Sequence, residues 1–194
     1  GMAVQRMMER VLPVVYKGTK YEDCLPIGSM DIVDNFPYKD LRDYYQKWYR
    51  PDLQAIIVVG DIDVDKMEQK IRRTFADVPK PTNPAERVYY PVADNDKMIV
   101  AIDKDTEQPI MLVNLYMKQE ATPDSEKNLV ATARKSYVTE LVTSMINSRL
   151  ADIKRQATPP FHSASVGAGQ FLISKTKDAF SLSFGCLQEN VKGS

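Results

Sequence analysis

The chain contains a single histidine, His162, and this limits the catalytic chemistry that its sequence can support. Catalytic zinc sites use three protein ligands, drawn mainly from His, Asp, Glu and Cys. No second histidine or Cys cluster accompanies His162, so we interpret it as a surface histidine of a strand or loop. Ser163 and Ser165 follow it, but the pattern of a nucleophile elbow is absent. The sequence therefore predicts no catalytic residue and no metal ligand, which leaves little support for an independent hydrolase.

A second group of chemically capable side chains lies between residues 44 and 63. Its aromatic members could form a ligand platform, although their helical spacing is more typical of a buried core. Arg50 could bind a peptide carboxylate, but its place before Pro51, at a bend from helix to strand, favours a hydrogen bond to backbone. Asp61 and Asp63 could suggest a cation site, yet turn and N-cap roles explain both. The aromatic residues are Tyr44, Tyr45, Trp48 and Tyr49.

Composition and charge exclude several classes of partner. The 26 basic residues balance 26 acidic ones, so the sequence lacks the basic excess typical of proteins that bind nucleic acid or anionic membranes. No apolar run approaches the roughly 18 residues of a membrane span. Gly1 before Met2 resembles a remnant of tag removal, so we expect that the true N-terminus is not present. We expect a soluble protein, periplasmic or cytoplasmic, whose compartment the sequence leaves unknown.

Cys24 and Cys186 are the only cysteines, and they lie far apart in the sequence. Two free thiols are the favoured interpretation, and a long-range disulfide is the alternative.

Apolar periodicity predicts several helices and one central strand in the first part of the chain. Helices are expected over residues 4–15, in a short turn capped by Ser29, and over 41–49. The branched run 55–59 predicts a buried strand, and Gly60 permits a tight turn after it. Asp63 is then the expected N-cap of a helix over 64–75 with an apolar stripe of Met67, Ile71, Thr74 and Phe75.

The second part of the chain follows a proline-rich segment at residues 79–84, which predicts a stiff linker. Strands are expected over 98–102, 110–117, 161–169, 171–174 and 180–187. Between the first two and the last three, helices are expected over 125–147 and 148–156. The longer helix has a predicted apolar stripe of Leu129, Ala133, Val138, Leu141, Val142 and Met145. Helices followed by a strand-rich part indicate the α+β class.

An ordered set of residues resembles a signature of the M16 zinc metallopeptidases, the pitrilysin, insulinase and mitochondrial processing peptidase group. A loop with glycine, tyrosine and Pro-Ile-Gly precedes a helix that ends in Tyr-x-x-Trp-Tyr-Arg-Pro and a strand that ends in Val-Gly-Asp. The stretches 105–117 and 146–161 resemble the start of the second family domain. The matching signature residues are Gly18, Tyr21, Pro26, Ile27, Gly28, Tyr45, Trp48, Tyr49, Arg50, Pro51, Val59, Gly60 and Asp61.

The resemblance implies parts of two M16-type (LuxS/MPP-like) α/β sandwich domains, each with a mixed or antiparallel sheet and helices on one face. We expect residues 1–79 to end the first domain, 80–86 to form the proline-rich linker and 87–194 to begin the second. The family binds zinc through a His-x-x-Glu-His motif and a later Glu, none of which this chain supplies. A structural role is predicted for Tyr45, Trp48, Tyr49, Arg50, Pro51, Gly60 and Asp61.

The resemblance therefore implies a fragment of a zinc-dependent endopeptidase that is inactive alone. In the intact parent we expect zinc as the cofactor and a peptide or protein as the substrate. The alternative is a non-catalytic homologue that acts as a structural or assembly subunit. Exposed apolar surface from Tyr44, Trp48 and residues 55–59 would favour self-association or domain swapping.

Overall fold

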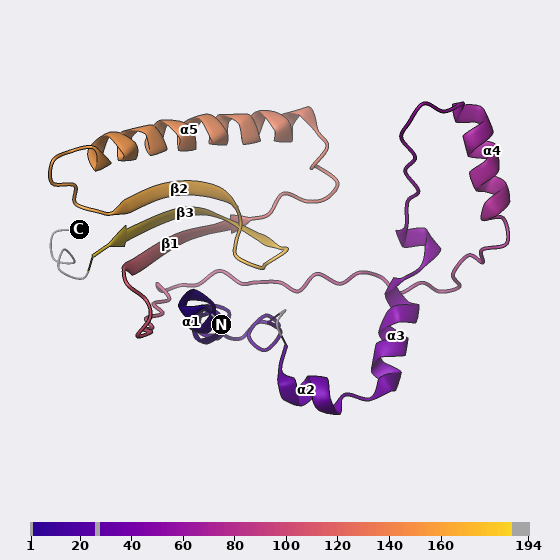
Figure 1. The fold of residues 1–194 in the computed structure, drawn as a ribbon, viewed down its shortest axis with the longest axis horizontal. Helices are drawn as coiled ribbons and strands as arrows, with labels where there is room; N and C mark the ends of the chain where they lie inside the picture. The colour runs from indigo at the N-terminus through magenta and orange to yellow at the C-terminus, as the bar shows by residue number, and fades with distance from the viewer. Residues whose placement is uncertain (1, 26–27, 188–194) are drawn as a thin grey trace. The chain divides into compact units, whose positions relative to one another are not determined.

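The computed structural model describes residues 2–25 and 28–187, and it divides into two compact units. The first unit combines residues 1–26 with residues 89–194, and the second consists of residues 27–88. Figure 1 shows all helices and strands of the described chain. These units do not coincide with the expected domains, residues 1–79 and 87–194. The expected domains are parts of the intact family domains, and their boundaries remain a prediction.

The first unit is built on a three-stranded antiparallel sheet with the strand order β1-β3-β2. Strand β1 covers Met111–Glu120, β2 covers Ser163–Gln170 and β3 covers Lys177–Cys186. The register places Met111 opposite Cys186 and Ser163 opposite Gly185. Both outer strands were expected within a few residues, and the α+β class is confirmed.

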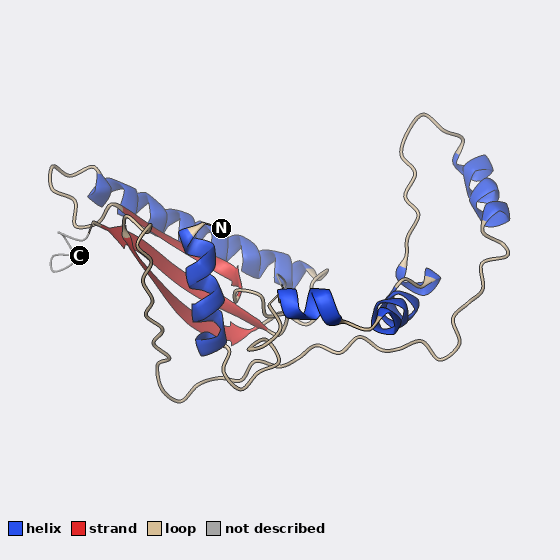
Figure 2. Ribbon diagram, turned by 60° about the horizontal axis from the view of Figure 1, so that its bottom comes forward, coloured by secondary structure: helices blue, strands red, loops and turns tan. Residues whose placement is uncertain are grey.

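Helix α5, Val130–Lys154, runs along β2 in both views (Figures 1 and 2). The side-chain amide of Asn147 accepts a hydrogen bond from the Val166 N–H at 2.8 Å and donates one to the Val166 carbonyl at 3.0 Å. The helix is continuous where two helices were expected. Its partly buried face includes Thr143, Ile146 and Leu150, whereas the predicted stripe is exposed, with Leu141 at 47% and Met145 at 61%.

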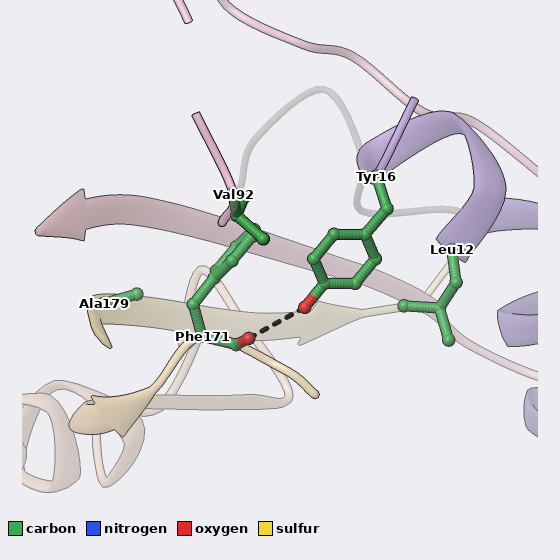
Figure 3. Close-up of a cluster of buried hydrophobic side chains, with 5 residues drawn as sticks. All are labelled: Leu12, Tyr16, Val92, Phe171 and Ala179. Carbon is green, nitrogen blue, oxygen red and sulfur yellow. Dashed lines mark hydrogen bonds between the residues drawn. The ribbon is translucent and has the colours of Figure 1, made fainter. Parts of the chain in front are cut away.

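The buried core of the first unit joins the N-terminal helix to the turn between β2 and β3. Helix α1, Ala3–Val15, contributes Leu12, and Tyr16 follows it directly. Figure 3 shows the Tyr16 ring beside Phe171, with the Tyr16 hydroxyl donating to the Phe171 carbonyl at 2.8 Å. The remaining cluster members are Val92 and Ala179.

The second unit contains helices and extended segments, and its described residues include no strand. Helix α2 covers Met30–Asn35, α3 covers Tyr38–Trp48, a short 3₁₀ helix covers Pro51–Leu53, and α4 covers Val64–Thr74. The expected cap of α4 is confirmed, because an Asp63 carboxylate oxygen accepts a hydrogen bond from the Lys66 N–H at 3.1 Å.

Three expected strands are wrong for the described chain. Residues 55–59 and 98–102 pair with no described strand and are largely exposed, and a strand requires a neighbour for its backbone groups. Residues 171–174 instead form the turn between β2 and β3, where Leu172 adopts a positive φ of 52°. Periodicity cannot reveal a missing neighbour, and it cannot distinguish a short strand from a buried turn.

Both cysteines are free, as favoured from the sequence. Cys24 is exposed, and Cys186 is buried at the end of β3.

Candidate functional site

The signature residues at the end of α3 form a compact arrangement around Arg50. The Tyr49 N–H donates to the Tyr45 carbonyl at 2.8 Å and closes the helix. Arg50 is extended, with φ −107° and ψ 150°, as expected for a residue that precedes a proline. Pro51 then begins the 3₁₀ helix. The proline therefore disfavours a helical backbone at Arg50, which is consistent with the end of α3 just before this residue.

Arg50 is the only buried residue among the described residues of the second unit, with 8% exposure. Its Nε donates to an Asp52 carboxylate oxygen at 3.1 Å, and its Nη1 donates to the Ala85 carbonyl at 2.9 Å. The guanidinium carbon also lies 5.9 Å from the centre of the Trp48 ring, which is a cation–π distance. These contacts tie the end of α3 to the segment that follows the prolines.

The aromatic residues of α3 do not form the core that their spacing predicted. The Tyr45 and Tyr49 rings stack with their centroids 4.7 Å apart, but each residue is 60% exposed. Tyr44 is 59% exposed. No other described segment of this unit covers these rings, so the amphipathic pattern has no partner surface within the unit.

An open hollow of about 590 Å³ lies beside Arg50, between the end of α3 and the proline-rich segment. Its lining includes Lys47, Tyr49, Arg50, Pro51 and residues 79–85. None of the lining residues is an acid, a histidine or a cysteine, so the lining supplies no carboxylate, imidazole or thiolate of the kind that binds zinc.

Gly60 and Asp61 follow the exposed run 55–59, and the structure gives no steric reason for Gly60. A Cβ added there would meet nothing nearer than the Ile62 Cγ2 at 3.9 Å. Asp61 is exposed. The nearby carboxylate that accepts a backbone hydrogen bond is that of Asp63, and the bond from the Lys66 N–H is the main cause of its lowered pKa.

His162 lies at the entrance to β2, where its backbone N–H donates to the Gly185 carbonyl at 2.8 Å. Ser163 and Ser165 line a smaller hollow of about 210 Å³ with Asn114 and Ser183. The Ser183 hydroxyl donates to the Asn114 amide oxygen at 2.7 Å. Across residues 2–25 and 28–187, no group of three or more His, Cys, Asp or Glu residues could hold a metal ion.

A buried lysine in the first unit was missed by the sequence analysis. Lys177 Nζ donates to the Asp94 carboxylate at 2.9 Å and also to Glu120, while its side chain is only 5% exposed. Hydrogen bonding to these two carboxylates raises the pKa of Lys177, and the bond from Lys177 lowers the pKa of Asp94. The arrangement ties the start of β3 to the end of β1. The alternation of apolar and polar residues along a strand does not predict such an ion pair.

A second ion-pair group was also missed, and it fixes α1 to the segment before β1. Arg6 donates through Nε and Nη2 to Asp105, at 2.9 and 2.7 Å, and Arg10 pairs with Asp103. The Arg6 hydrogen bond, with a further one from the Glu107 N–H, lowers the pKa of Asp105 to about 2. These contacts join residues that lie 93 and 99 positions apart.

The Arg50 arrangement lies within a stretch that matches a known protein family. The family model described as the Peptidase M16 inactive domain matches residues 35–193. The chain belongs to the M16 peptidase family. The match begins before α3, and it includes the Arg50 arrangement, the proline-rich segment and the whole sheet.

Curated relatives carry names of zinc proteases. A zinc protease PQQL-like protein of Arabidopsis thaliana is 27% identical over 167 residues, covering 86% of this chain and 17% of the relative. The probable zinc protease PqqL of Escherichia coli is 28% identical over 139 residues, covering 71% of this chain and 15% of the relative. This chain thus spans about a sixth of the length of these relatives.

Solved structures share the fold. The periplasmic protease PqqL from Escherichia coli aligns with a TM-score of 0.78 and 22% identity, over 99% of this chain and 21% of that one. The ferredoxin protease FusC, solved as a mutant in complex with Arabidopsis ferredoxin, aligns with a TM-score of 0.70 and 22% identity, over 96% and 20% of the two chains. At this identity the similarity concerns the fold alone.

Gly18 and Gly28 adopt positive φ angles of 79° and 71°, which glycine tolerates better than other residues. The signature residues Pro26 and Ile27 lie outside the described part of the chain. No described helix is long and apolar enough to cross a membrane.

Proposed function

We propose that this chain is a non-catalytic, scaffolding part of an M16 zinc metallopeptidase. The observation that carries the proposal is the match to the family's inactive domain over residues 35–193, in a chain with only one histidine. The zinc protease names of the curated relatives support the same reaction class for the intact parent. In that parent, a zinc-bound water would attack the peptide bond, and the residues that bind the zinc would lie outside this chain.

In this proposal the signature residues stabilise the fold and do not contact the substrate. The hydrogen bond from Arg50 to the Ala85 carbonyl supports this role, because it connects α3 to the chain beyond the prolines. The boundaries 1–79, 80–86 and 87–194 are proposed as the end of one family domain, a linker and the start of the next. Part of the wall around the peptide substrate would come from this chain.

The peptidase assay tests the proposal directly. The purified chain is incubated with zinc and an unstructured peptide, with and without a chelator, and the intact parent serves as the positive control. We expect chelator-sensitive cleavage by the parent and none by this chain. Cleavage by this chain that the chelator abolishes would contradict its non-catalytic role.

The sequence of the longer parent separates an active protease from a non-catalytic homologue. An intact His-x-x-Glu-His motif before this region would support the protease, and a degraded motif would favour a structural or assembly subunit. A periplasmic location is proposed by analogy with the PqqL structure, with the cytoplasm as the alternative. Self-association of this chain is also proposed.

A further inference from the structure

The turn between β2 and β3 binds the segment that follows α1 through two tyrosine side chains. The Tyr16 hydroxyl donates to the Phe171 carbonyl at 2.8 Å (Figure 3) and accepts from the Ile173 N–H at 3.1 Å. The Tyr21 hydroxyl accepts from the Lys175 N–H at 3.3 Å, and the centroids of the two tyrosine rings lie 5.3 Å apart. Backbone groups of the turn are therefore the partners of both hydroxyls.

The same turn also holds the segment with which the chain returns to the first unit. The Val92 N–H donates to the Thr176 hydroxyl oxygen at 3.2 Å, and that hydroxyl donates to the Tyr90 carbonyl at 3.3 Å. Lys177, the next residue, donates to the Asp94 carboxylate at 2.9 Å. The second unit lies between these two segments in the sequence, so one turn holds the chain on both sides of it.

Hydrogen bonds within the turn fix the conformation that presents these backbone groups. Ser174 is fully buried, and its hydroxyl oxygen accepts from the Thr176 and Lys177 N–H groups at 3.2 and 3.1 Å. Leu172 has a positive φ of 52°, a conformation that a leucine adopts only where its surroundings impose it. A surface that is fixed in advance loses little conformational entropy when a partner binds, which favours affinity.

The two tyrosines and the turn belong to different family domains under the proposed boundaries, residues 1–79 and 87–194. We propose that this turn is the surface on which the first family domain docks, and that the segment with Tyr16 and Tyr21 is the part that binds it. The inference rests on the proposed function, because it takes the domain boundaries from there. In the parent, the zinc motif would precede this chain in the first domain, so the docked segment would fix the zinc site relative to the second domain.

Ion pairs along α1 add a second, more exposed part to the same interface. Arg10 Nε donates to Asp103 at 2.8 Å, and Arg6 donates to Asp105 through two nitrogens. Both pairs also cross the proposed domain boundary. Salt screens exposed ion pairs, whereas buried contacts are screened much less. The docked segment should therefore be held less tightly at high salt, but it should not be released.

Cutting the chain between the tyrosines and the second unit tests whether the docking holds without a covalent connection. A protease site inserted between Gly28 and Ser29, both exposed, separates residues 1–28 from the rest of the complete chain. A dye on the exposed thiol of Cys24 reports release of this piece on dilution, through fluorescence anisotropy, because the other thiol, Cys186, is buried. We expect the piece to remain bound after cleavage and to elute together with the rest of the chain.

Tyr16→Phe combined with Tyr21→Phe should speed release of the cut piece at least about tenfold, because the turn loses its hydrogen bonds to both hydroxyls. Tyr44→Phe combined with Tyr137→Phe is the matched control, because these residues are 59% and 62% exposed. Circular dichroism of each uncut chain checks that its helices and sheet are intact. Arg10→Gln, at a half-exposed side chain, should make the release rate less sensitive to salt.

Release of the wild-type piece as soon as the chain is cut would overturn the proposal, and so would equal release rates of the two double variants. An unchanged salt dependence in Arg10→Gln would overturn the ionic part of the interface. The wild-type and Arg10→Gln measurements require no change in the buried core. None of these measurements uses peptidase activity, so their failure is distinct from a failure of the proposed function.

Discussion

At the scale of single residues, the hydroxyl of Tyr16 holds together two parts of the first unit. Tyr16 is fully buried, and its hydroxyl donates to the Phe171 carbonyl and accepts from the Ile173 N–H at 3.1 Å. Burial raises the pKa of this phenol, so it remains a neutral donor over the physiological range. The turn between β2 and β3 therefore depends on a side chain that follows α1.

Tyr16→Phe should lower the free energy of unfolding of the first unit by about 1–3 kcal/mol, because it leaves the buried Phe171 carbonyl and the partly buried Ile173 N–H without their partner. Tyr137→Phe is the control, since Tyr137 is 62% exposed and its substitution should change stability by less than about 0.5 kcal/mol. Urea unfolding followed by circular dichroism measures both. Equal stability of the two variants would contradict the role of the hydroxyl.

The pairing of Asp94 with Lys177 predicts a pH-dependent contribution to stability. A carboxylate with a lowered pKa stabilises the fold above its unfolded pKa, near 4, and loses that effect as the pH falls through its folded value. Asp94→Asn should therefore destabilise the first unit at pH 7, and the difference from wild type should shrink below about pH 4. Asp96→Asn, at an exposed position, is the control, and urea titrations at pH 3, 5 and 7 provide the comparison.

At the scale of elements, α5 acts on β2 as a neighbouring strand would. Asn147 supplies one acceptor and one donor to the backbone of Val166, and β2 is an outer strand of the sheet. The periodicity of α5 did not reveal this, because the helix has apolar residues on more than one side. The face that contacts β2 includes threonines and an asparagine, and the stripe chosen from the sequence is exposed.

Asn147→Ala should lower the free energy of unfolding of the first unit by about 1–3 kcal/mol, because Val166 loses both hydrogen bonds. It should also increase amide hydrogen exchange in β2. Ser144→Ala, on the exposed side of α5, should leave both quantities nearly unchanged. Unchanged exchange at Val166 in Asn147→Ala would show that the amide is not its main partner.

Arg50→Lys should loosen the connection between α3 and the proline-rich segment while it keeps the charge. A lysine ammonium cannot reproduce the directions of the planar guanidinium toward Asp52 and Ala85. Trp48 is the only tryptophan, so its fluorescence reports on this site alone. We expect a red-shifted emission and faster proteolysis within residues 79–88 than in Arg42→Lys, an exposed control on α3. Identical spectra and cleavage rates would contradict a tethering role.

At the scale of the whole molecule, the two units have very different interiors. The buried hydrophobic residues among the described ones all belong to the first unit, and the second unit buries only Arg50. Because burial of apolar surface is the main source of cooperative stability, the second unit should unfold at lower urea than the first. Trp48 fluorescence and the far-ultraviolet circular dichroism should therefore give separate transitions. A single coincident transition would contradict this prediction.

The sequence predicted those features of the chain that depend on local patterns. The helices, the outer strands of the sheet and the Asp63 cap follow from periodicity and capping, and the signature around Trp48 and Arg50 led to the correct family. Residues 55–59 show the limit of such patterns. Their composition predicts a strand, but a strand exists only when a second segment supplies its hydrogen bonds, and sequence periodicity carries no information about that segment. Long-range ion pairs such as Lys177–Asp94 were missed for the same reason.

The hydrogen bond between Tyr16 and Phe171 joins residues 155 positions apart, and this separation has a consequence for synthesis on the ribosome. At about 5–20 residues per second, Tyr16 precedes its partner by on the order of 10–30 s. During that interval α1 has neither the turn nor the sheet to cover Leu12 and Tyr16. The first unit therefore completes its core only after nearly all of it has been translated.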